Sequence, residues 1–148
     1  MARLPVPGEY PLLPHDIEAE EAYLSCCFLG FEIPWDARLN PTDFYRERNG
    51  WVLEAMMKAK AVDTILVAAE LRRVGRLDAI GGWAYLAHLI GAAATPFHAQ
   101  YYAELVRDAA EQRRMIEEGL KQVQAGYEGK LAKGPPAVWE LDEPRNPL

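Results

Sequence analysis

The chain has 148 residues, half of them apolar and 26% charged, with a formal net charge of −6. This length and composition are typical of one globular domain with its own core. The acidic balance argues against a module that binds duplex nucleic acid, because contacts with phosphates need a basic face. No apolar run approaches the roughly 20 residues of a membrane span, and prolines interrupt the N-terminal segment where a signal peptide would have its apolar helix. We therefore expect a cytoplasmic protein that makes no contact with membranes.

The N-terminal half of the chain predicts an arm followed by two helices. Residues 1–13 are rich in proline and indicate an extended arm. A helix is predicted over residues 16–29, with Asp16 as its N-cap. After a loop over residues 31–41, the apolar spacing predicts a second helix over residues 43–60. Gly50 weakens that helix by roughly 1 kcal/mol relative to Ala and makes it a candidate place for a kink or break.

The C-terminal half predicts three further helices. One follows a cap at Asp63 or Thr64 and ends near Gly75, where glycines then form a tight corner before a short helix over residues 83–93. Thr95-Pro96 is a typical helix start, and the long helix that it begins is predicted over residues 95–125. Residues 126–148 contain repeated glycine and proline and predict a flexible tail or linker. The fold class predicted is all-α, with a domain over residues 14–125 made of a compact head of about five to six helices (14–94) and the long helix.

The motifs of nucleotide hydrolysis and nucleophilic catalysis are absent from the sequence. The Gly129-Lys130 pair is followed by Leu131, and Gln124 stands where a Walker A motif has its first glycine. No GxSxG elbow occurs, and the adjacent Cys26 and Cys27 sit in an apolar run that favours buried, unreactive thiols. We therefore predict a protein that is not an enzyme.

The titratable residues do not form a recognisable site in the sequence. The three histidines lack the helical spacing of a zinc site, so neither a metal nor a cofactor is expected. Glu18, Glu20 and Glu21 could be mistaken for a general acid–base pair. At the start of a helix they are better explained as a solvated face that the helix dipole favours.

The long helix carries an apolar series spaced alternately by four and three residues. Its members form the candidate protein interface: Tyr102, Val106, Ala109, Arg113, Ile116, Leu120 and Val123. We expect the first part, Tyr102 to Ala109, to pack within the chain. For the second part, Arg113 to Val123, we expect a contact with another chain, and Gly119 would allow a partner backbone to approach closely.

Four blocks of the sequence stand in a recognisable order and spacing: Pro14-His15-Asp16-Ile17-Glu18-Ala19-Glu20 with Leu24; Asp43-Phe44-Tyr45-Arg46 with Ala55-Met56; Asp63-Thr64, Leu71, Gly75, Leu77, Gly81-Gly82 and Tyr85-Leu86; and Tyr101-Tyr102-Ala103, Val106-Arg107 and Arg113. Taken together, these blocks resemble the N-terminal domain of the bacterial and phage replicative DNA helicases of the DnaB type. The resemblance covers residues 14 to about 125.

This resemblance implies a helical head followed by a helical hairpin, of which the long helix would be the first half. In that family the two parts assemble into a collar on the helicase ring, which receives the primase and contributes to contacts with loaders and initiators. The resemblance therefore implies self-association, as a dimer or higher, and a primase or a replicative helicase as partner.

The sequence departs from the family pattern in four respects. Asn49 stands where the family usually has histidine, and Ser25 where it usually has glycine. The second helix of the hairpin is not recognisable in residues 129–148, and the motor domain is absent. The chain is thus part of, or accessory to, an ATP-dependent DNA helicase, and the sequence does not distinguish a fragment from a separate short protein.

The leading hypothesis is a non-catalytic protein-interaction and oligomerisation module of DNA replication. A first alternative is a replication factor that binds single-stranded nucleic acid through Arg72, Arg73 and Arg76, with Trp83 or Tyr85 as stacking partner. The net charge makes direct contact with nucleic acid the weaker expectation. A second alternative is the helicase-binding domain of a primase, which has a related helical architecture.

Overall fold

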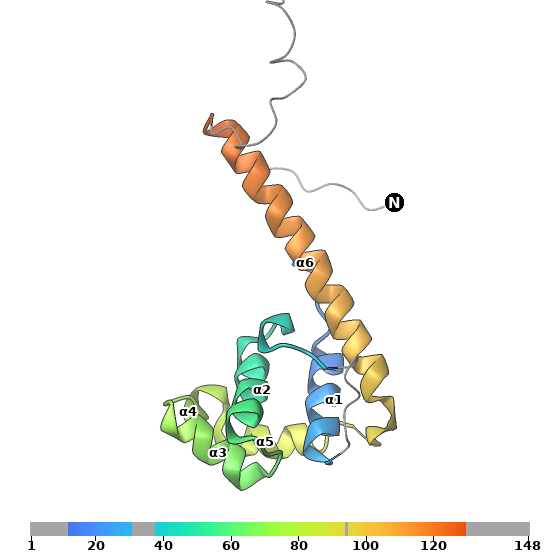
Figure 1. Ribbon diagram of the computed structural model, residues 1–148, viewed down its shortest axis with the longest axis vertical. Coiled ribbons are helices and arrows are strands. Elements are labelled where there is room, and N and C mark those ends of the chain that lie inside the picture. Colours follow the sequence, from blue (N-terminus) through green and yellow to red (C-terminus); the bar gives the residue numbers. More distant parts are fainter. Residues whose placement is uncertain (1–11, 31–37, 94, 130–148) are drawn as a thin grey trace, which may run out of the picture. The chain divides into compact units, whose positions relative to one another are not determined.

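The computed structural model describes residues 12–30, 38–93 and 95–129, and every regular element within these ranges is helical. The all-α prediction is therefore confirmed. Most of the predicted arm (1–13) and tail (126–148) lies outside the described residues. The elements in chain order are α1 (Ile17–Phe28), the 3-10 helix η2 (Pro41–Asp43), α2 (Glu47–Ala59), α3 (Thr64–Arg73), α4 (Leu77–Ile80), α5 (Gly82–Ile90), the 3-10 helix η3 (Pro96–His98) and α6 (Ala99–Tyr127) (Figure 1).

The chain divides into two units, Met1–Arg114 and Met115–Leu148. In the first unit, α1 packs against α5 and α2, and α2 packs against α3. These helices and the beginning of α6 enclose one main hydrophobic core. Its largest fully buried apolar side chains are Leu24, Val52, Val67, Leu71, Ile80, Leu86, Leu89 and Val106. The described part of the second unit is the C-terminal portion of α6.

Helix α1 begins and ends where the sequence predicts. The Asp16 carboxylate caps it by accepting a hydrogen bond from the Ala19 amide at 3.0 Å. Towards its other end, the Ser25 hydroxyl donates to the Ile90 carbonyl at 3.0 Å and accepts from the Ala93 amide at 3.1 Å. These two bonds satisfy backbone groups at the end of α5 and fix α1 against that helix.

The prediction of a second helix over residues 43–60 places the start of the helix too early. Asp43 is the last residue of η2, and its carboxylate accepts from the Asn40 amide at 2.8 Å. Phe44 then takes an extended conformation, and α2 begins at Glu47. The apolar spacing had joined two helices because Phe44 does enter the core, from an extended segment rather than from a helix.

Gly50 causes no break in α2, contrary to the possibility raised above. The helix continues through it to Ala59, and Gly50 is buried. A β-carbon at this position would lie 2.5 Å from the Pro41 carbonyl oxygen. The glycine therefore allows η2 to approach the helix backbone.

The glycine corner contains an additional helical turn. Helix α3 is capped by the Asp63 carboxylate, which accepts from the Ile65 and Leu66 amides, and Gly75 follows it with φ +74°. The four-residue α4 then brings Leu77 and Ile80 into the core before Gly81 (φ +110°) turns the chain into α5. The corner was expected to be a loop because one turn of helix is too short to show periodicity.

The long helix is shifted along the chain relative to its prediction over residues 95–125. Residues 96–98 form η3, in which the Thr95 hydroxyl accepts from the Phe97 amide at 3.3 Å, and α6 begins at Ala99. Helix α6 continues to Tyr127, and Gly129 follows with φ +73°.

Candidate protein interface

The first three members of the apolar series on α6 belong to the first unit. Val106 is 1% exposed and lies in the main core, Ala109 is buried, and Tyr102 is half-buried against the core. These three side chains therefore contribute to the folding of the first unit.

The predicted series is wrong for Arg113, which it places in the part that faces another chain. Its side chain is buried, and its guanidinium donates to the Pro14 carbonyl at 2.9 Å and to the Asp43 carbonyl at 2.7 Å. It also lies 5.5 Å from the centre of the Tyr45 ring. A guanidinium has five N–H donors in a fixed geometry. Two of those of Arg113 bind the carbonyl of Pro14, just before α1, and the carbonyl of Asp43, at the end of η2. Next to it, Arg114 forms an ion pair with the Asp43 carboxylate.

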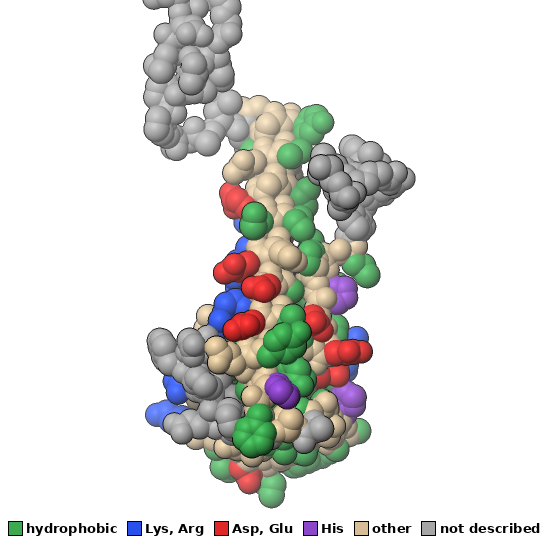
Figure 2. Space-filling view, turned by 90° about the vertical axis from the view of Figure 1, so that its right-hand side faces the viewer, with side chains coloured by type: hydrophobic (Ala, Val, Ile, Leu, Met, Phe, Trp, Pro, Cys, Tyr) green, Lys and Arg blue, Asp and Glu red, His purple; other side chains and the backbone are tan. Residues whose placement is uncertain are grey.

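The last three members of the series remain exposed in the second unit. Ile116, Leu120 and Val123 have exposed fractions of 40%, 42% and 56%. Tyr127 continues the series by four residues and is 89% exposed. The sequence prediction does not include Tyr127 because Gly126 indicates the end of the helix. We call Ile116, Leu120, Val123 and Tyr127 the α6 seam. Figure 2 shows hydrophobic side chains on the surface of this part of α6.

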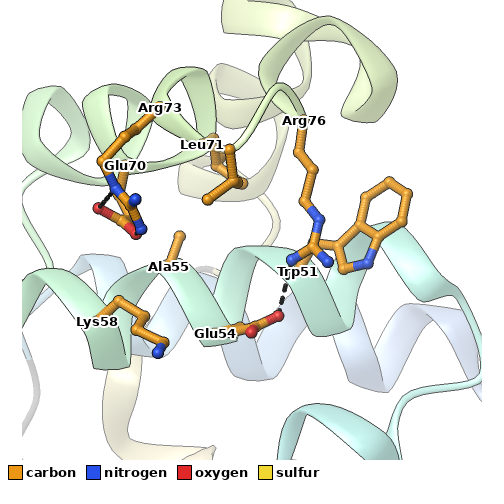
Figure 3. A pocket seen from close by; sticks show the side chains of 9 residues that line it. Trp51, Glu54, Ala55, Lys58, Glu70, Leu71, Arg73 and Arg76 are labelled. Carbon is orange, nitrogen blue, oxygen red and sulfur yellow. Dashed lines mark hydrogen bonds and ion pairs between the residues drawn. The ribbon is translucent and has the colours of Figure 1, made fainter.

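Two of the three arginines of the nucleic-acid alternative are engaged with carboxylates, whereas Arg72 is exposed. Arg73 pairs with Glu70 at 2.6 Å, and Arg76 pairs with Glu54 at 2.8 Å (Figure 3). Arg76 also lies over the Trp51 ring, with its guanidinium carbon 4.8 Å from the ring centre. These pairs border a cavity of about 220 Å³ between α2 and α3. The carboxylates of Glu54 and Glu70 offset most of the positive charge of the side chains that line it.

Tyr85 is wrong as a stacking partner for a base. The side chain is buried, its hydroxyl donates to the Asn49 side-chain oxygen, and the Arg48 guanidinium covers the ring at 3.9 Å. Burial also raises the pKa of the Tyr85 hydroxyl. Trp83 is 48% exposed, but one exposed ring does not by itself provide the series of aromatic rings and the basic groove that bind a single strand.

The prediction of a solvated acidic face on α1 is wrong for Glu20 and Glu21. Glu20 is 1% exposed, and its carboxylate accepts from the Tyr45 amide at 2.6 Å, the Arg46 amide at 3.3 Å and the Asn49 side chain at 3.0 Å. Glu21 is half-buried and pairs with His88 at 2.9 Å, whereas Glu18 is exposed. The missed signal is spacing, because Glu20 precedes the core residue Leu24 by one helical turn. The Glu20 carboxylate holds the segment that enters α2 and is closed off from any substrate.

Comparison with known proteins gives the family. The family model described as DnaB-like helicase N terminal domain matches residues 12–108 of this chain. The chain belongs to this family. The chain is 38% identical to the replicative DNA helicase DnaB of Mycobacterium leprae over 122 residues, which are 78% of this chain and 20% of that helicase. It is 36% identical to the replicative DNA helicase DnaB of Geobacillus stearothermophilus over 120 residues, 77% of this chain and 26% of that one.

A solved structure confirms both the DnaB-type resemblance and the fold. The crystal structure of the N-terminal domain of DnaB helicase from Mycobacterium tuberculosis superimposes with a TM-score of 0.73 at 38% identity, covering 78% of this chain and 88% of that chain. The chain thus spans about a fifth to a quarter of the length of the two full helicases above, and most of the length of an N-terminal domain.

Asn49 and Ser25, which the resemblance predicts to differ from the usual DnaB-type pattern, both make buried polar contacts. Asn49 is fully buried and joins Glu20 to the Tyr85 hydroxyl. Ser25, also fully buried, makes the two bonds to the end of α5 described above. An amide and a hydroxyl are thus each satisfied at these positions, so both departures are compatible with the fold of the family.

Both cysteines of this DnaB-type chain are free and buried. Burial raises the pKa of the Cys27 thiol to about 12 and raises that of Cys26 as well. Because the thiolate is the reactive form, we expect neither cysteine to react with Ellman's reagent at pH 8 in the folded protein. Both are expected to react once urea unfolds the chain. Rapid reaction of one thiol in the native protein would show that α1 is open to solvent at that point.

Within the described residues, no group of three His, Cys, Asp or Glu side chains is arranged to hold a metal ion. The same residues include no helix that is both long and apolar enough to cross a membrane.

Proposed function

We propose that this chain is a non-catalytic protein-interaction and oligomerisation module of DNA replication. It acts either as the N-terminal domain of a replicative helicase or as a separate protein alongside a replicative helicase. Its family and the names of its relatives support the assignment to replication. The sequence lacks a Walker A motif, so a contribution to helicase action would come through protein contacts. The partners proposed are further copies of this chain and a primase or a replicative helicase.

The α6 seam is the single observation that carries self-association. Its three aliphatic side chains, Ile116, Leu120 and Val123, are separated by four and then three residues, and each is at least 40% exposed. Aliphatic side chains at this spacing form the contact face of paired helices. Burying each half-exposed side chain would contribute about 1 kcal/mol, and the contribution is doubled when two copies of the seam pair.

Light scattering after size exclusion, over a concentration series of the whole chain, tests this proposal. We expect a mass of two or more copies that falls on dilution. A monomer at every concentration would contradict self-association. A pull-down then separates the two roles in replication: a module of the helicase type is expected to capture the primase, whereas a primase-like module would capture the helicase.

A double substitution tests the α6 seam directly. We expect Ile116→Asp with Leu120→Asp to give a folded protein of lower mass, because burying an unpaired carboxylate costs several kcal/mol. Circular dichroism reports whether the helices remain, and light scattering reports the mass. Met115→Asp is the matched control, since Met115 is 75% exposed and lies off the seam on the same turn of α6. It is expected to leave the mass unchanged, and an equal effect of both variants would contradict the seam.

A further inference from the structure

A second apolar surface lies in the first unit. It is a groove of about 920 Å³ formed by α1, α2 and the connection from α2 to α3. The apolar side chains that line it include Tyr23, Cys27, Leu53, Met56, Met57 and Val62. We call it the α1–α2 groove. Most of these side chains are buried and form its floor, whereas Met57 is 56% exposed and Val62 is 40% exposed.

The charged residues described in the groove lining are Arg38 and Lys60, and both are exposed. A third cation is close, because the Arg107 guanidinium donates to the Arg38 carbonyl at 2.9 Å. Lys60 is held by the end of α2, where it takes the left-handed conformation (φ +53°) and its amide bonds to Met56 and Met57 carbonyls. In a chain with a net charge of −6, both charged side chains among the described residues that line this apolar surface are thus cations.

We propose that the α1–α2 groove docks an amphipathic helix of a partner protein, with acidic residues beside its apolar face. The apolar floor accepts the aliphatic side chains, and the exposed Lys60 ammonium meets a carboxylate of the partner helix. Methionine is suited to such a site because its unbranched side chain adapts to different apolar surfaces. A helix is the expected form because no described residue belongs to a strand, which leaves no sheet edge for an extended peptide to join.

This inference goes beyond the proposed self-association and does not depend on it. No residue named as lining the groove belongs to α6, so the seam and the groove can be tested separately in one protein.

Methionine methyl signals offer the most direct test. The chain has four methionines, two in the groove (Met56 and Met57) and two elsewhere (Met1 and Met115). The whole chain, labelled with carbon-13 on its methionine methyl groups, is titrated with a helical peptide of leucine and glutamate, about 15 residues long so that it can form a helix. We expect the Met57 signal to shift and the Met115 signal to stay. A peptide with lysine in place of every glutamate is expected to bind far more weakly.

Two matched variants locate the charge contribution. Lys60→Glu is expected to weaken binding of the acidic peptide about fivefold, the size of a surface charge pair. Lys121→Glu, an exposed lysine on α6, is expected to leave the affinity unchanged. Equal binding of the acidic and basic peptides, or equal effects of the two variants, would overturn the proposal.

The remaining outcomes identify other occupants. A shift of Met115 without Met57 would mean that the peptide binds the part of α6 that carries the seam, and no shift at all would mean that the groove binds no acidic helix. Binding that appears only after Phe31 and Trp35 are replaced with serine would mean that the chain's own residues 31–37 occupy the groove. Each of these results overturns the proposal.

Discussion

Replacing Glu20 with alanine is expected to lower the free energy of unfolding by about 3–5 kcal/mol, the range for removing one partner of a buried charged group. The carboxylate is fully buried, and its loss leaves the amides of Tyr45 and Arg46 and the side chain of Asn49 without their acceptor. The two amides lie directly before α2, whose own N-cap residue makes no side-chain cap. Glu20 therefore holds the segment that leads into α2, where its charge also favours the helix dipole.

Urea denaturation followed by circular dichroism measures this change. Glu18→Ala is the matched control, because Glu18 is exposed on the same helix, and its loss is expected to cost less than about 1 kcal/mol through the dipole of α1. Glu20→Gln is expected to fall between the two, since it keeps an acceptor oxygen and loses the charge. Equal costs for Glu18→Ala and Glu20→Ala would mean that water enters and satisfies the three donors.

The helices of this chain could be predicted because their signals are local. Asp16 and Asp63 each mark a helix start through their own side chains, and apolar spacing identified the helices that they begin. The same spacing wrongly predicts a helix where an apolar residue enters the core from an extended segment. Phe44 is the example, because it made η2 and α2 look like one helix.

The polar contacts of the candidate sites depend on residues that meet only in the folded chain. Arg113 has the spacing of an interface residue, but carbonyls of Pro14 and Asp43, 99 and 70 residues away, bind its guanidinium. Tyr85 has an aromatic ring that could stack on a base, but Asn49 binds its hydroxyl and the Arg48 guanidinium covers the ring. The α1–α2 groove likewise combines segments that are separated in sequence. Periodicity locates an exposed face such as the α6 seam, and it carries no information on such distant partners.

Gly50→Ala is expected to destabilise the chain by about 1–3 kcal/mol, the cost of forcing an extra carbon into a packed site. Helix propensity alone predicts the opposite sign, because alanine is favoured over glycine within a helix by roughly 1 kcal/mol. The new β-carbon would lie 2.5 Å from the Pro41 carbonyl oxygen, which is backbone and cannot rotate away as a side chain would. Either η2 must move from α2 or the helix must shift, and both disturb the Asp43 contacts that hold Arg113.

Gly119→Ala is the matched control because it makes the same change within a helix. Nothing lies within 4 Å of the added carbon at that position, so helix propensity is expected to decide the sign. We expect Gly119→Ala to increase the helical signal of α6 and Gly50→Ala to lower the thermal midpoint of the first unit. Circular dichroism at 222 nm during heating measures both. A raised midpoint for Gly50→Ala would mean that η2 yields without cost, and the close approach to Pro41 would then not be what selects glycine there.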